Sequence, residues 1–145
     1  MKPFSLQPVL DLMQTRTDEA TRRLAQLIGM ENDAKNKRDM LQQYRDEYAS
    51  RFRQAAQNGI GKREWSNYQE FIGRIDEAIE QQSQTVRLQE RHTATGQAHW
   101  QQQRTKLKAF DTLSQRHQAS EIANELRQEQ RIQDEFASRH YDSED

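Results

Sequence analysis

"QNGIGKREWSNYQEFI", residues 57–72, contains the one strong turn signal between two long and repetitive stretches of the chain. Asn58 and Gly59 can end a helix in the left-handed conformation without a steric penalty, and Ile60 can fold back on the last helical turn. Gly61 can start a second helix, in whose first turn Glu64 would face the positive end of the helix dipole. The stretch therefore predicts the tip of a hairpin of two helices.

A heptad pattern on both sides of the turn indicates the type of hairpin, because seam positions spaced four and three apart are typical of a coiled coil. Before the turn, the predicted seam passes through Leu6, Leu10, Met13, Thr17, Ala20, Leu24, Leu27, Glu31, Ala34, Arg38, Leu41, Arg45, Tyr48, Phe52 and Ala55. After the turn, it passes through Trp65, Tyr68, Ile72, Ile75, Ile79, Gln82, Val86, Gln89, Thr93, Gly96, Trp100, Gln103, Leu107 and Phe110. We predict an all-α fold, a long two-helix antiparallel coiled-coil hairpin with an overhanging C-terminal helix.

The two predicted helices differ in length. A single coiled-coil domain over residues 1–145 would have helices at about 4–57 and 62–138, a turn at 58–61 and a frayed acidic C-terminus at 139–145. Pairing about residues 59–60 places Tyr48 near Phe71, Leu24 near Thr95, and Phe4 near residue 115. The rest of the second helix has no partner within the chain. Its apolar stripe is typical of a docking helix and comprises Ile122, Leu126, Ile132 and Phe136.

The composition favours long helices over a conventional core. Hydrophobic residues make up 32% and charged residues 31% of the chain, whereas ordinary globular domains have roughly 45–50% and about 25%. Disorder is the competing class, but the net charge of −1 and the regularly spaced aromatic residues argue against it. The chain has no cysteine, which excludes a disulfide framework, a thiolate nucleophile and a zinc ribbon.

Neither a signal peptide nor a membrane span is predicted. Pro3 and Pro8 interrupt the first residues, and no run approaches the roughly 20 apolar residues that a spanning helix needs. We expect a cytoplasmic protein that touches a membrane only through a partner.

Enzymatic, metal and nucleic-acid functions find little support. "GIGKR", residues 59–63, lacks the glycine spacing and the strand of a nucleotide-binding loop. The four histidines are too far apart in sequence to form a metal-binding pair on one helical face, and they are His92, His99, His117 and His140. A two-helix rod offers no enclosed pocket for catalysis, and its basic residues alternate with acidic ones. We expect no enzyme activity, no cofactor, no metal and no nucleic-acid partner.

Extra aromatic residues widen the seam near the tip. Tyr44 on the first helix and Phe71 and Ala78 on the second lie beside the seam positions. Such residues either shield a loosely packed tip or, as aromatic anchors on a rigid surface, bind a partner. Trp65, Tyr68 and Ile72 are expected to be buried in the seam, and Tyr44 and Phe71 to lie outside it.

Two motifs resemble the FliJ family of flagellar export proteins. They are "NGIGKREWSNYQEFIGRIDEAIEQ", residues 58–81, and "LQQYRDEY", residues 41–48. The resemblance implies a component of the flagellar type III export apparatus that is similar in shape to the central stalk of rotary ATP synthases. It also implies a cytoplasmic location peripheral to the inner membrane at the flagellar basal body. The implied partners are the export ATPase FliI and its regulator FliH, the cytoplasmic domain of the export gate protein FlhA, and the export chaperones, which it would help to recycle.

The resemblance also assigns surfaces to two of these partners. The gate-binding residues would be Leu41, Tyr44, Tyr48, Phe71, Ile75 and Ala78, although Lys37 and Gln82 stand where the family can carry glutamine and histidine. The ATPase ring would contact the opposite end, through Leu6, Leu10, Met13, Ile122, Leu126, Ile132 and Phe136. The alternative hypothesis is a generic cytoplasmic scaffold that associates with itself through its open stripes.

Overall fold

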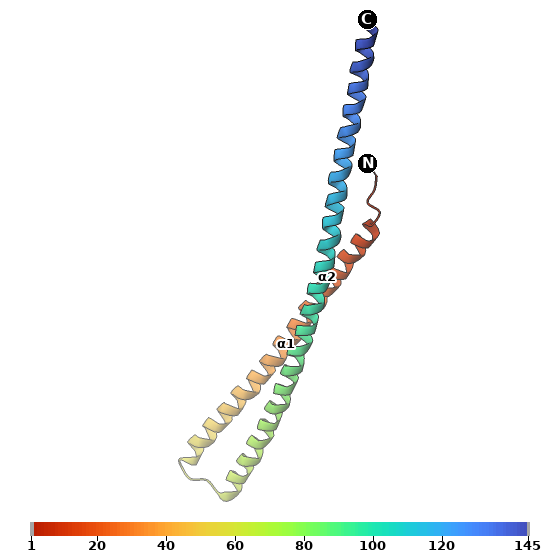
Figure 1. Ribbon diagram of the computed structural model, residues 1–145. Coiled ribbons are helices and arrows are strands. Elements are labelled where there is room, and N and C mark those ends of the chain that lie inside the picture. Colours follow the sequence, from red (N-terminus) through yellow and green to blue (C-terminus); the bar gives the residue numbers. More distant parts are fainter. Residues whose placement is uncertain (1, 145) are drawn as a thin grey trace. The chain divides into compact units, whose positions relative to one another are not determined.

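The computed structural model describes residues 2–144, with the side chains of residues 2–142. These residues form two α-helices and no strand: α1 spans Gln7–Ala56 and α2 spans Lys62–Glu144 (Figure 1). The predicted all-α, two-helix fold is confirmed. The described residues divide into two compact units, one containing residues 20–100 and the other combining the residues up to 19 with those from 101 onward.

The helix ends differ from the predicted ones. α1 begins at Gln7 rather than at residue 4, because Pro3 lies within a non-helical segment and Pro8 occupies the first turn, where proline is tolerated. α2 continues to Glu144 rather than ending at about 138, since no glycine or proline stops it. The predicted frayed end at 139–145 is therefore helical as far as the structure describes it. Asp145 lies outside the described residues.

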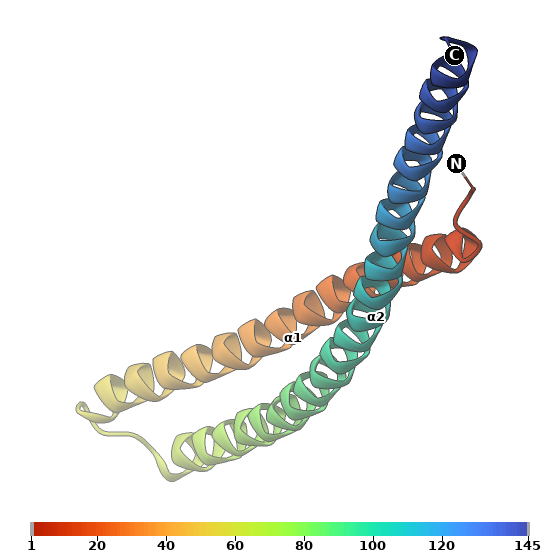
Figure 2. The ribbon, with the colours of Figure 1, turned by 45° about the horizontal axis from the view of Figure 1, so that its top comes forward.

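In the unit of residues 20–100, the two helices run antiparallel and are joined at one end by the turn (Figures 1 and 2). Gly59 has a φ of 84°, the left-handed conformation expected of a helix-ending glycine. The Trp65 amide donates to the Gly61 carbonyl at 3.1 Å, so Gly61 caps the start of α2 as predicted. The turn therefore forms where the sequence indicates.

The core of this unit follows the predicted seam. Its buried apolar side chains are Ala20, Leu27, Ala34, Ile72, Ile75 and Val86, which are 1–9% exposed. Gly96 allows a close approach of the two helices, because a Cβ atom at that position would overlap Leu27 Cδ1. Tyr48 and Phe71 pack with ring centroids 4.4 Å apart, as the antiparallel pairing predicts.

Polar seam residues of this unit bond across the helix pair. Gln82 Nε2 donates to the carbonyl of Ala34 at 3.0 Å, and Trp100 Nε1 donates to Thr21 Oγ1 at 2.9 Å. Thr93 Oγ1 lies 3.3 Å from the carbonyl of Leu27. These bonds satisfy polar groups that the seam would otherwise bury without partners.

In the other unit, the start of α1 packs against α2 through a small core. Met13, Thr17 and Gln103 are buried, and Thr17 Oγ1 lies 3.2 Å from the Gln103 carbonyl. The non-helical segment 2–6 continues this cover along α2. His117 Nε2 donates to the carbonyl of Lys2 at 2.9 Å, and the Phe4 and His117 rings are 5.5 Å apart. Phe4 therefore lies within one turn of its predicted partner at residue 115.

Beyond Glu121, every described side chain from residue 122 to residue 142 is exposed, although Lys2 still borders a groove along α2 that reaches Arg131. The predicted overhang is thus present. Across residues 2–144, neither helix contains a stretch that is apolar enough to cross a bilayer.

Candidate partner-binding surfaces

Six aromatic rings form a continuous ladder between α1 and α2 next to the turn. The Phe52 and Tyr68 rings stack with centroids 3.7 Å apart and planes 8° apart, and Tyr68 also contacts Tyr48 at 5.8 Å. Trp65 lies at one end of the ladder, 5.7 Å from Phe52. Tyr44 lies at the other end, with its ring 6.3 Å from that of Phe71 in an edge-on geometry. We call these residues the aromatic ladder: Tyr44, Tyr48, Phe52, Trp65, Tyr68 and Phe71.

The exposure of two residues of the aromatic ladder, Trp65 and Phe71, differs from what the sequence predicts. Trp65 was expected to be buried in the seam, but it is 50% exposed because α1 ends at Ala56 and offers only Phe52 opposite one face of the indole. Phe71 was expected outside the seam, but it is half-buried because Tyr44 and Tyr48 contact it from α1. Tyr44 is 50% exposed, as its expected place beside the seam requires.

The predicted gate-binding residues differ in how far they can reach a partner. Ile75 is buried, and Leu41, Tyr48, Phe71 and Ala78 are half-buried. Tyr44 is the exposed member of the set, and ring contacts join it to Phe71 and Phe71 to Tyr48. A partner at this surface would therefore contact the Tyr44 ring and the exposed atoms of its half-buried neighbours.

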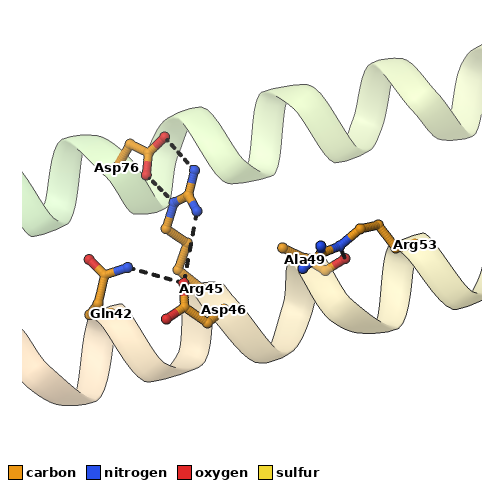
Figure 3. Close-up of polar contacts among 6 residues, drawn as sticks. All are labelled: Gln42, Arg45, Asp46, Ala49, Arg53 and Asp76. Carbon is orange, nitrogen blue, oxygen red and sulfur yellow. Dashed lines mark hydrogen bonds and ion pairs between the residues drawn. The ribbon is translucent and has the colours of Figure 1, made fainter.

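An ion pair crosses the helices beside this surface (Figure 3). Arg45, a polar break in the predicted seam, extends its guanidinium to Asp76 of α2, with Nη2 at 3.4 Å from Oδ2 and Nε bonded to Oδ1. The hydrogen bond to Asp76, followed by the attraction of its charge, raises the pKa of Arg45 above its usual value. The pairing about residues 59–60 places Arg45 opposite Arg74, two residues before Asp76, so the heptad pattern did not predict this ion pair.

The predicted ATPase-binding residues do not form one surface. On the overhang, exposure rises along the helix through Ile122 at 46%, Leu126 at 60%, Ile132 at 67% and Phe136 at 73%. Leu6, just before α1, is 38% exposed, but Met13 within α1 is buried. Leu10 lines a groove together with Leu107 rather than with the overhang. The residues of α1 and those of the overhang therefore lie along different stretches of α2.

We call the exposed set on α2 the overhang stripe, comprising Ile122, Leu126, Ile132 and Phe136. At 100° per residue, its members lie within about 120° of one another around the helix, which is one face. The Phe136 ring stacks parallel to His140 of the next turn, with centroids 6.3 Å apart. An apolar face of this kind on a helix without a tertiary neighbour is available for docking.

No group of three metal-ligating side chains comes together among the described residues. His117 bonds to the segment 2–6, and the His140 ring stacks on that of Phe136. These two histidines therefore make contacts with other side chains or backbone groups and are not surrounded by solvent alone.

The whole chain resembles known flagellar proteins. A family model described as "Flagellar FliJ protein" matches residues 1–144. The flagellar FliJ protein of Salmonella typhi is 31% identical over 135 residues, which cover 93% of this chain and 92% of that protein. The flagellar FliJ protein of Escherichia coli K12 is 28% identical over the same shares of the two chains.

A solved structure shares the fold. It is that of a Chlamydia trachomatis protein described as a YscO homologue, with a TM-score of 0.58 over 95% of this chain and 94% of that one. The sequences are 16% identical, so this likeness concerns the fold alone.

Proposed function

This chain belongs to the flagellar FliJ protein family and is a component of flagellar protein export, and from this premise we propose that it acts by binding rather than by catalysis. Its proposed partners are the export ATPase FliI with its regulator FliH, the cytoplasmic domain of the export gate protein FlhA, and export chaperones that it helps to recycle. It would work in the cytoplasm, peripheral to the inner membrane at the flagellar basal body.

One observation carries this proposal: α2 contributes to two separate apolar surfaces that the chain itself leaves uncovered. One lies in the unit that holds the turn, where Tyr44 is 50% exposed. The other is the overhang stripe, whose Leu126 and Phe136 are 60% and 73% exposed. Exposed aromatic and large aliphatic side chains on rigid helices are good interface anchors. Two such surfaces suit a component that binds two partners at once.

We assign the gate to the surface around Tyr44, with Leu41, Tyr48, Phe71 and Ala78 as its half-buried surroundings. Ile75, which is 7% exposed, supports this surface from below rather than contacting the partner. We assign the ATPase to the overhang stripe, together with Leu6 from the segment before α1. Met13 belongs to the core of its unit and is left out of the contact surface.

A pull-down of the purified chain with FliI and with the FlhA cytoplasmic domain tests both assignments. We expect Leu126→Ser with Phe136→Ser to lose FliI binding and ATPase stimulation while FlhA binding persists. Tyr44→Ala should do the reverse and weaken FlhA binding by about 1–2 kcal/mol, a common value for an interface aromatic. Leu88→Ser is the matched control, because Leu88 is 47% exposed but lies on neither surface.

Two outcomes would contradict the proposal. If each variant weakened the binding of FliI and of FlhA equally, the two surfaces would not be separate binding sites. If the chain stayed multimeric at low micromolar concentration and bound neither partner, a self-associating scaffold would be the better description.

A further inference from the structure

The segment around the turn is basic. Residues 51–65 hold four of the chain's 22 Lys and Arg residues but one of its 23 Asp and Glu residues, so this segment is basic although the whole chain has a net charge of −1. Arg51 and Arg53 lie at the end of α1, and Lys62 and Arg63 begin α2. The four cations therefore flank the turn, two on each helix.

These four cations are not neutralised within the described part of the chain. Elsewhere in the same unit, Arg74 pairs with Glu70 at 2.7 Å, and Lys35 pairs with Glu31 at 3.6 Å. By contrast, no ion pair joins the tip cations to a carboxylate among the side chains of residues 2–142, and Arg53 Nε donates to the helix carbonyl of Ala49 (Figure 3). All four side chains are exposed, so their charge is directed at the solvent.

Apolar groups accompany the cations. Trp65 exposes half of its surface, and Ile60 lies half-buried in the link between the helices. Tryptophan is enriched where proteins meet the lipid headgroups, because its ring is largely apolar but carries a polar N–H group. Four to eight Lys and Arg residues near such groups are typical of segments that bind anionic lipids.

We propose that the tip, defined as Arg51, Arg53, Ile60, Lys62, Arg63 and Trp65, binds the surface of an anionic lipid bilayer. The cations would lie among the headgroup phosphates, and Trp65 would enter the interfacial layer without spanning it. An acidic protein would also attract these charges. However, long side chains that pair with no carboxylate of the described residues match a diffuse layer of phosphates better than a fixed pattern of carboxylates. This proposal does not depend on the surfaces assigned to FliI and FlhA.

The number of tip cations limits how strongly the tip can bind an anionic bilayer. Each Lys or Arg near an anionic surface increases partitioning about fivefold at moderate salt. Four of them together contribute at most about 600-fold, and the gain falls as added salt screens the charges. The expected binding is therefore reversible and dependent on salt.

Co-sedimentation of the purified full chain with lipid vesicles tests the proposal. We expect binding to vesicles of phosphatidylcholine and phosphatidylglycerol in a two-to-one ratio, and a loss of binding on pure phosphatidylcholine or at high salt. In the Trp100→Phe background, the remaining fluorescence reports Trp65 alone, and its emission should shift to the blue on the anionic vesicles. Trp100 bonds to Thr21, so the melting curve of this variant is measured first.

A matched pair of charge variants locates the surface. The tip variant carries Arg51→Gln, Arg53→Gln, Lys62→Gln and Arg63→Gln, and we expect it to bind at least about tenfold more weakly. The control carries Arg116→Gln, Arg127→Gln, Arg131→Gln and Arg139→Gln, which removes the same charge from exposed positions of the other unit. It should bind the vesicles as the unchanged chain does.

Three results would overturn the proposal. One is the absence of binding to anionic vesicles at low salt, and another is an equal loss in both charge variants. The third is a tip variant that keeps vesicle binding but binds the FlhA cytoplasmic domain more weakly, because the cations would then serve an acidic protein surface. The vesicle assay contains no protein partner, so its failure would leave the proposed function intact.

Discussion

At the scale of single residues, Gly96 sets how closely the two helices can approach. A Cβ atom there would overlap Leu27 Cδ1, and Leu27 is 3% exposed and has little room to move. Gly96→Ala gains up to about 1 kcal/mol of helix propensity but incurs an overpacking cost of about 1–3 kcal/mol. We expect the free energy of unfolding to fall by about 1 kcal/mol, which thermal unfolding followed by circular dichroism would measure.

Gly73 supplies the matched control for this substitution. It is exposed within α2, and an added Cβ would meet no atom within 4 Å. Gly73→Ala should therefore stabilise the protein by about 0.5–1 kcal/mol. Equal effects of the two alanines would show that Leu27 moves aside freely and that Gly96 is not a packing constraint.

Single residues also show where the sequence was insufficient. The heptad pattern correctly predicted buried Val86 and Ile72 and the contact of Tyr48 with Phe71. It failed for Trp65, because a repeat gives the angular position of a residue but not whether the opposite helix extends far enough to cover it. Burial of Trp65 depends on the end of α1 at Ala56, and helix ends are less regular than helix faces.

At the scale of helices, the segment 2–6 is bonded to α2 at Glu121, whose Oε2 accepts a hydrogen bond from the Lys2 amide at 3.3 Å, and the side chains from residue 122 onward are exposed. A chain shortened to end after Glu121 should therefore keep its melting temperature. A chain ending after Gln115 loses the contacts of His117 and Glu121 with the segment 2–6, and its unfolding free energy should fall by about 1–2 kcal/mol. Thermal unfolding of the two shortened chains would measure the difference.

If both shortened chains melted lower than the full chain by the same amount, the overhang itself would stabilise the helix pair. This comparison also shows what the sequence missed at this scale. The pairing about residues 59–60 predicted where the first helix would reach on the second. It did not predict that residues 2–6 would continue the cover as a non-helical segment, because no periodicity marks such a segment.

At the scale of the whole molecule, stability depends on the thin cores of the two units, in which seven apolar side chains are buried among the described residues. Glutamine occupies some of the remaining seam, and the buried Oε1 atoms of Gln89 and Gln103 have no hydrogen-bond partner among the described residues. Gln103→Leu removes an unsatisfied acceptor and adds apolar burial, which we expect to raise the unfolding free energy by about 1–3 kcal/mol. Denaturant unfolding would measure this gain.

Gln101→Leu is the control, because Gln101 is exposed on the same helix and its replacement should change stability little. A loss of stability in Gln103→Leu would mean that Gln103 satisfies its amide in solution and that the polar seam is stabilising. The sequence predicted the seam position of Gln103 but not its lack of a partner, since that depends on the rotamers of neighbouring side chains. The assignment of the two binding surfaces to their partners stays a prediction, which binding experiments with those partners test.

The bare end of α2 has a consequence for the lifetime of the protein in the cell. A helical segment of about twenty residues without tertiary contacts is marginally stable and opens often. Proteolytic enzymes cleave such open segments, and exposed apolar residues such as Phe136 mark them for removal. Copies whose overhang is covered by a partner should survive longer than unassembled copies, so the abundance of this protein would adjust itself to the number of assemblies that need it.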